Sequence, residues 1–189
     1  MLHGIRLERD AGNDNYRPMA FTHCLCLPSE SLTLGTVQTL RTKKTNAPDS
    51  VTVLGHPTRH ADAAARLASQ SLLPLDRPFS LAELLAALQR HGTVVGVTQP
   101  IWAITDAVAV LCWAEERAQA EALIVRSIEE AKTWPLGLGR RRDWWVQWEA
   151  TLRALLDRTD YPQTIEAQIG IHGLAALPSY ELKRDEPLG

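Results

Sequence analysis

Hydrophobic residues in the first half of the chain form short apolar runs that alternate with helical stretches. Residues 20–27 and 51–54 are two such runs of strand length, and most of the second run is β-branched. Residues 61–71 are rich in alanine and predict a helix, and residues 72–75 form another short apolar run. Strands that alternate with helices in this way predict βα units on a parallel sheet.

A helix start is marked at Ser80. Ser80 and Glu83 match a capping box, in which each side chain accepts a hydrogen bond from the backbone N–H of the other residue. The leucines that follow recur at helical spacing and would share one buried face, at positions 81, 84, 85 and 88. Gly92 then supplies a helix stop, so we expect a helix that begins at Ser80 and ends before Gly92.

Beyond Gly92 the pattern becomes mainly helical. The run from Ile101 to Ala114 is apolar except for Thr105 and Asp106; it is too short to span a bilayer, so it predicts a buried core helix. One more strand is expected over residues 93–98, and helices are expected over residues 100–113, 116–134, 143–158 and from 160 to near 170 or 173.

These elements together predict an α/β fold, with a small parallel sheet of βα units followed by a mainly helical C-terminal half. The polar residues 1–19 suit a flexible arm, and the charged residues 178–189 suit a tail. Between them we expect an α/β region over 20–92 and a helical region over 93–177, which can pack together as one domain. Residues 32–43 fit a short helix or a strand equally well.

Composition narrows the class of protein. Of the 189 residues, 45% are hydrophobic and 22% are charged, and the net charge of -2 gives no field that would attract nucleic acid or an anionic membrane. Cys24, Cys26 and Cys112 cannot form a closed disulfide framework, and on a strand Cys24 and Cys26 would be poorly placed to bridge each other. With no apolar signal segment at the N-terminus, we expect a cytoplasmic protein without membrane contact.

Residues 20–91 resemble the second half of a response-regulator receiver domain. Residues 21–28 resemble the strand and loop that carry the family's phospho-accepting aspartate, and residues 51–56 with the following helix resemble the next βα unit. The proline–phenylalanine pair after Arg77 resembles the lysine–proline–phenylalanine triplet before the family's last helix. The resemblance implies βα units of the receiver or flavodoxin type.

Three departures from the receiver pattern affect its chemistry. Cys24 stands where the family has the aspartate, Gly55 where it has a hydroxyl residue, and Arg77 where it has the lysine. No acidic pair that would bind Mg²⁺ precedes them, so the resemblance implies a phosphorylation-independent scaffold that needs no metal or cofactor. A second register, with residues 21–27 as the first strand of a shorter flavodoxin-like sheet, leads to the same conclusion.

Two further features are candidate sites. Arginines and tryptophans gather beside a predicted helix start, where they could hold an anion, a nucleotide base or a partner, or simply pack in a core: Arg140, Arg141, Arg142, Trp144, Trp145 and Trp148. Asp106 is either a functional carboxylate or a paired core acid. Cys24, Cys26, His56 and His60 are zinc-ligand types at a spacing that does not match a zinc site, so no metal is expected.

The motifs of the common catalytic families are missing from the sequence. It has no nucleophile elbow, phosphate-binding loop or dinucleotide fingerprint, so no catalytic residue is predicted. With the resemblance, this favours a non-enzymatic regulatory or adaptor protein of a bacterial-type signalling pathway, which acts by contact with another protein or with a second copy of itself. Two alternatives stay open: a small stand-alone binding protein such as a toxin immunity protein, and a nucleotide or anion binder that uses residues 140–148.

Overall fold

The computed structural model divides the chain into two compact units. The first unit, which holds the strands, comprises Met1–His23, Leu34–Ala87 and Ser179–Gly189, and the helical unit comprises Cys24–Thr33 and Leu88–Pro178. The residues that the structure describes are 2–9, 15–30, 36–40, 42, 51–52, 59–75, 77–93, 99–134 and 143–176.

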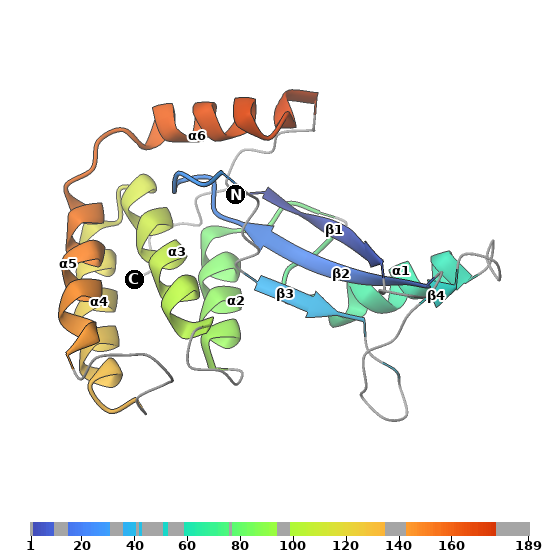
Figure 1. The fold of residues 1–189 in the computed structure, drawn as a ribbon, viewed down its shortest axis with the longest axis horizontal. Helices are drawn as coiled ribbons and strands as arrows, with labels where there is room; N and C mark the ends of the chain where they lie inside the picture. The colour runs from blue at the N-terminus through green and yellow to red at the C-terminus, as the bar shows by residue number, and fades with distance from the viewer. Residues whose placement is uncertain are drawn as a thin grey trace. The chain divides into compact units, whose positions relative to one another are not determined.

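The first unit contains a four-stranded sheet around β2 (Asn15–His23). Strand β1 (Leu2–Arg9) lies along one edge of β2, and β3 (Thr36–Thr39) and the short β4 (Val51–Thr52) pair with its other edge (Figure 1). All three pairings with β2 are antiparallel. The backbone N–H of Leu40 extends the β2–β3 ladder by donating to the carbonyl oxygen of Pro18, at 3.1 Å.

The predicted parallel sheet of receiver-like βα units is therefore wrong. Residues 20–27, predicted as one strand, supply only the end of β2, and residues 51–52 pair antiparallel with its beginning. Strands also occupy much of the 1–19 segment that the polar pattern assigned to an arm. An antiparallel sheet can have one face in water, so its strands need no apolar run, and a search for apolar runs misses them.

Helix α1 (Arg59–Gln70) confirms the helix predicted from the alanine-rich stretch. Its Ala63 and Leu67 lie one turn apart on the same face, and they pack in a buried cluster with Ala20 of β2 and with Leu40. Leu67 and Leu40 are both fully buried. The core of this unit thus lies between α1 and the sheet.

Helix α2 (Leu81–Thr93) begins at the predicted capping box. The N–H of Glu83 donates to the Ser80 hydroxyl at 3.2 Å, and the N–H of Ser80 donates to the Glu83 carboxylate at 2.9 Å. The helix runs through Gly92 to Thr93, so Gly92 does not end it, and the strand expected over 93–98 falls mostly outside the described residues.

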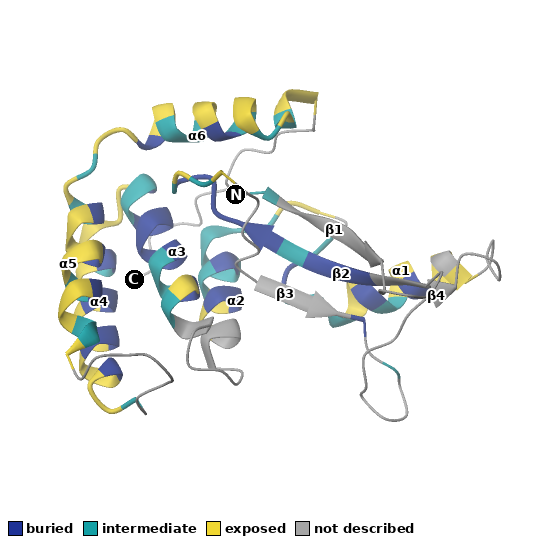
Figure 2. Cartoon of the chain, viewed as in Figure 1, coloured by how far each residue is buried: buried dark blue, intermediate teal, exposed yellow. Residues whose placement is uncertain are grey.

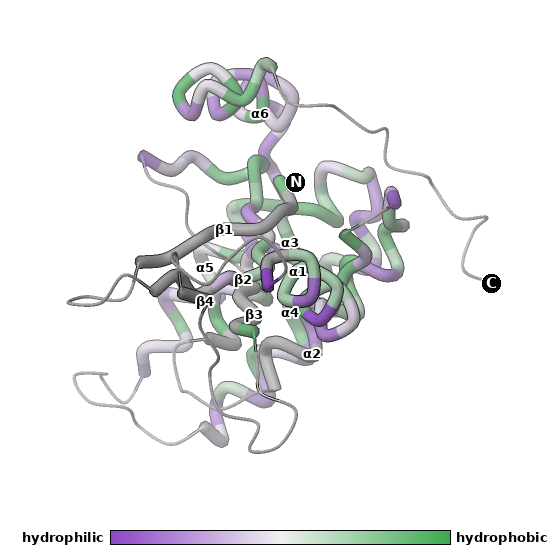
Figure 3. Tube along the Cα trace, turned by 90° about the vertical axis from the view of Figure 1, so that its right-hand side faces the viewer, coloured by the Kyte–Doolittle hydropathy of each residue, from purple (hydrophilic) through white to green (hydrophobic). Residues whose placement is uncertain are grey.

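The described part of the helical unit contains four further α-helices at the predicted places and a 3-10 helix at Leu174–Ala176. None of the described helices has the length and apolar character needed to cross a membrane. Helix α3 contacts both α4 and α5, and Figure 2 shows it as buried along most of its length. Helix α6 mixes hydrophilic and hydrophobic residues (Figure 3) and buries Tyr161 and Gln168. The bounds are α3 (Gln99–Trp113), α4 (Arg117–Ala131), α5 (Trp144–Leu156) and α6 (Tyr161–Ile171).

A tight turn joins α3 to α4. Glu115 has a φ of 65°, in the left-handed region, and its N–H donates to the carbonyl of Cys112 at 3.1 Å. The N–H of Glu116 donates to the carbonyl of Leu111 at 2.9 Å. These two bonds form a Schellman motif, which caps the last carbonyls of α3 and turns the chain back so that α4 packs against it.

Candidate functional site

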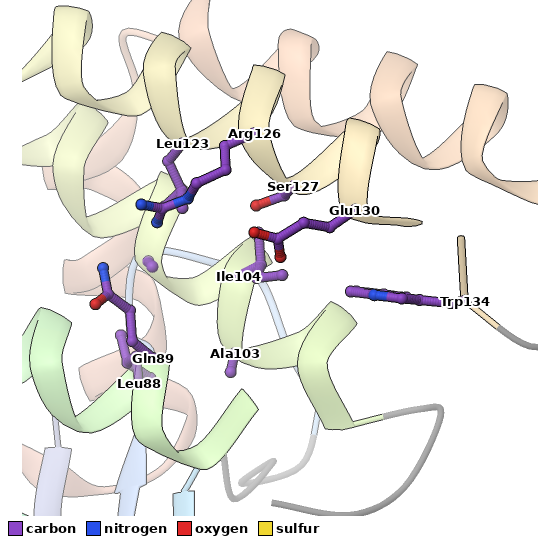
Figure 4. A pocket seen from close by; sticks show the side chains of 10 residues that line it. Leu88, Gln89, Ala103, Ile104, Leu123, Arg126, Ser127, Glu130 and Trp134 are labelled. Atoms are coloured by element: carbon purple, nitrogen blue, oxygen red, sulfur yellow. The ribbon is translucent and has the colours of Figure 1, made fainter. Parts of the chain in front are cut away.

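A pocket of about 460 Å³ opens in the helical unit between the end of α2, α3 and α4 (Figure 4). Its volume lies within the range of known ligand pockets. Its floor is apolar and its edges carry polar groups, together with the indole of Trp134. The lining residues are Leu88, Gln89, Ala103, Ile104, Ala107, Leu123, Arg126, Ser127, Glu130 and Trp134.

Helix geometry explains why these residues meet. Leu123, Arg126, Ser127 and Glu130 are three or four positions apart on α4, so they form one face of that helix. Two alanines of α3, Ala103 and Ala107, lie one turn apart and are both buried. Because an alanine side chain is a single methyl group, this part of α3 leaves space that larger side chains would fill.

Two opposite charges stand at the edge of the pocket. The side chains of Arg126 and Glu130 are exposed, and neither forms a hydrogen bond or ion pair with another residue of the described ranges. In Figure 4 the guanidinium of Arg126 extends toward the side of Gln89, and the carboxylate of Glu130 lies near Ile104 on the side of Trp134. The pocket therefore offers a cation at one end and an anion toward the other.

Trp134 belongs to a cluster of three indoles that fixes this end of the pocket. Its ring centroid lies 6.0 Å from that of Trp144 and 5.9 Å from that of Trp148, and those two are 5.7 Å apart. Trp148 is buried, and its indole N–H donates to the hydroxyl of Thr105 on α3 at 3.2 Å. The cluster thus joins the end of α4 to α5 and α3.

The structure gives packing roles to the tryptophans that the sequence singled out as part of an anion or partner site. Trp144 stacks on both Trp134 and Trp148, and Trp145 lies beneath the ammonium group of Lys132, which is 5.2 Å from the ring centroid. Arg140, Arg141 and Arg142 lie outside the described residues, so an anion site at residues 140–148 stays a prediction.

The degenerate receiver positions do not make a described site. Cys24 is buried in a turn of the helical unit, Arg77 is exposed in the first unit, and Gly55 lies outside the described residues. Arg77 forms an ion pair with Glu83, with 2.6 Å between Nη2 and Oε1. This guanidinium, together with the backbone N–H of Ser80, lowers the pKa of Glu83 to about 2, so Arg77 supports the start of α2.

Asp106 lies 7% exposed on α3. Burial raises the pKa of its carboxyl group to about 7, because a charged carboxylate loses its hydration there. No hydrogen bond or ion pair links its side chain to another described residue, and both interpretations of Asp106 from the sequence stay predictions. A charge on Asp106 also disfavours ionisation of the thiols of Cys24 and Cys26.

Sequence reasoning missed the pocket itself. The apolar and charged positions of α4 are typical of an ordinary amphipathic helix. The alanines of α3 at positions 103 and 107, which line the pocket, are the one signal of missing volume, and a third alanine at position 109 does not line it. No group of three or more histidine, cysteine, aspartate or glutamate side chains among the described residues is placed to hold a metal ion. In comparisons with known proteins, the chain matches no family model, no curated protein and no solved structure.

Proposed function

We propose that the chain is a non-enzymatic binding protein that acts through contact with another protein, and that the pocket between α2, α3 and α4 is its binding site. The observation that carries this proposal is the apolar pocket edged by Trp134 and by Arg126 and Glu130, whose side chains have no polar partner among the described residues. The occupant is a segment of a partner protein that inserts an apolar side chain between an acidic and a basic residue.

The residue types of the pocket favour a protein partner. Protein interfaces combine an apolar centre with a polar rim, and tryptophan and arginine are the residues that most often dominate their binding energy. Here the apolar floor includes Ile104 and Leu123, and the rim includes Arg126 and Glu130. Charge complementarity then places the partner's acidic residue beside Arg126 and its basic residue beside Glu130 and the Trp134 ring.

This proposal does not depend on the receiver resemblance. The antiparallel sheet removes the parallel βα pattern on which a receiver-derived adaptor was based. A signalling adaptor and a toxin immunity protein are two ways in which such a binding site is used, and the identity of the partner separates them.

Site-specific photo-crosslinking tests the proposal. A photoreactive residue is placed at Gln89, which lines the pocket, and, as a matched control, at Val125, which is 55% exposed on α4 and does not line it. The full chain is then irradiated in the cells that naturally produce it. We expect one protein to be crosslinked from position 89 at least tenfold more than from position 125, and this product to be lost with Arg126→Glu.

Two results would contradict a protein occupant. Equal products from both positions would show that the pocket is not the contact surface. A small molecule that remains bound in native mass spectrometry, and that Ala107→Phe displaces, would assign the pocket to a low-molecular-weight ligand instead. Circular dichroism of each variant confirms that it is folded.

A further inference from the structure

Cys24 and Cys26 lie in a turn that begins where β2 ends at His23, and not on a strand. On a strand, residues two apart are separated by about 6.6–6.8 Å, at the upper limit for a disulfide. A turn shortens this separation, and each of the two thiols influences the pKa of the other. The geometric objection to a bridge between them, which assumed a strand, therefore does not apply.

The turn is held in place by α6 and the residues that precede it. The guanidinium of Arg158 donates to the carbonyl oxygen of Cys26 at 3.3 Å and to the hydroxyl of Thr164 at 2.7 Å. The N–H of Ser29 donates to the Gln168 side chain at 3.2 Å. Cys24 and Cys26 are 3% and 1% exposed, so the two sulfur atoms are held together in a confined space.

The two thiols differ in acidity. The hydrogen bond from Cys24, and to a lesser degree the charge of Arg158, lower the pKa of Cys26, although burial and Asp106 oppose them. The same hydrogen bond and burial raise the pKa of Cys24. A thiol with a lowered pKa beside a thiol with a raised pKa is the arrangement in which the first attacks and the second resolves.

We propose that Cys24 and Cys26 are a redox-modification site, a dithiol that an oxidant of the disulfide class converts into an intramolecular disulfide. The Cys26 thiolate attacks one sulfur of the oxidant, forms a mixed disulfide and releases the other half as a thiol. Cys24 then loses its proton and attacks the Cys26 sulfur, which releases the second half. The protein gives up two electrons and two protons, and one oxidant disulfide becomes two thiols.

Burial makes this reaction slow rather than impossible. Pro28 and Glu30 directly after the turn are exposed, so local opening of this short segment exposes the thiols without unfolding the helices. Cys112, on α3, is the competing partner, because a charge on Cys26 acts on the Cys112 thiol. The test must therefore show which pair is bridged.

The full chain, fully reduced, is incubated under native conditions in buffers with rising ratios of oxidised to reduced glutathione. Samples are quenched with acid, denatured and alkylated, and the mass of the intact chain is measured by mass spectrometry. The reduced chain carries three labels, one for each cysteine. We expect oxidation to lower the mass of the chain by two hydrogens and to leave a single label, which peptide mapping places on Cys112.

Variants make the outcome specific. Cys112→Ser should still form the bridge and end without a label, whereas Cys24→Ser and Cys26→Ser should each lose it. The inference fails if the wild-type chain keeps three labels even in oxidised glutathione alone, or if mapping finds Cys112 in the bridge. The wild-type and Cys112→Ser results decide the matter even if a substitution within the turn prevents folding.

Discussion

At the scale of single residues, Asp106 makes the stability of the protein depend on pH. Its carboxyl has a pKa of about 7 in the folded chain, against 3.8 when exposed, so the folded state holds this proton more tightly than the unfolded state. The free energy of unfolding therefore falls as pH rises from about 4 to 7 and is constant above 7 as far as this group is concerned. A shift of about three units corresponds to about 4 kcal/mol at most.

The substitution Asp106→Asn should remove this dependence, because asparagine has a similar shape and does not ionise. We expect urea unfolding at pH 8 to show a gain of about 2 kcal/mol or more over the natural chain, and little difference at pH 4. Glu166→Gln on α6, an exposed acid, serves as the control and should change neither value. Equal pH profiles for Asp106→Asn and the natural chain would show that Asp106 is hydrated in solution.

The charge of Asp106 also acts on the thiols of Cys24 and Cys26, so Asp106→Asn should make both thiols easier to ionise.

Glu115 is a second residue that lowers the stability of the fold, here through its backbone conformation. It occupies the left-handed position of the turn between α3 and α4, where a residue with a Cβ atom costs about 1 kcal/mol relative to glycine. Glu115→Gly should therefore raise the free energy of unfolding by about 1 kcal/mol, as measured by urea titration. Glu116→Gly is the matched control, since Glu116 has a φ of -90° and gains nothing from glycine. A loss of stability at position 115 would refute the strain assigned to this turn.

At the scale of elements, the start of α2 depends on Ser80. Its hydroxyl accepts the N–H of Glu83, one of the donors that an α-helix leaves unpaired at its start. Ser80→Ala should lower the free energy of unfolding by about 1 kcal/mol, and Ser80→Asp should restore most of it because aspartate also caps. Ser69→Ala near the end of α1 is a control, since among the described residues its hydroxyl bonds only to the carbonyl of Arg66 in its own helix. If Ser80→Asp is as unstable as Ser80→Ala, the cap is not the cause.

The helices were predictable from the sequence because their signals are local. Ser80, Glu83 and the leucines after them mark α2 within a few residues, and Pro162 stands in the first turn of α6. The sheet was not predictable in this way, because β1 and the start of β2 mix apolar and polar residues without an apolar run and are defined by pairing with each other. The end of β2 at His23 likewise changed the geometry assigned to Cys24 and Cys26.

At the scale of the whole molecule, the candidate site was the hardest feature to anticipate. Trp144 and Trp148, which the sequence pattern indicates as site residues, hold Trp134 in place at the edge of the pocket. The pocket itself requires three helices to meet around the small side chains of Ala103 and Ala107. Such a space depends on how helices pack, and the pattern within any single helix does not contain that information.

The charges of Arg126 and Glu130 can be exchanged without changing the composition of the molecule, which gives a test of the pocket. Exchanging them, Arg126→Glu together with Glu130→Arg, keeps the net charge at -2 and keeps both residues on the same face of α4. With glutamate now one turn before arginine, the free energy of unfolding should stay equal or rise by a few tenths of a kcal/mol.

Binding should respond differently from folding to this exchange. A partner whose acidic residue faces position 126 and whose basic residue faces position 130 meets like charges at both ends, so its affinity should fall by about 10- to 100-fold. The measurement is a titration of the crosslinked partner, monitored by tryptophan fluorescence because Trp134 lines the pocket. The exchange of Glu121 and Val125, outside the pocket on the same helix, is the control and should bind normally. Unchanged affinity for the charge-exchanged chain would mean that the partner does not contact Arg126 and Glu130. It would contradict the assignment of the pocket as the contact surface.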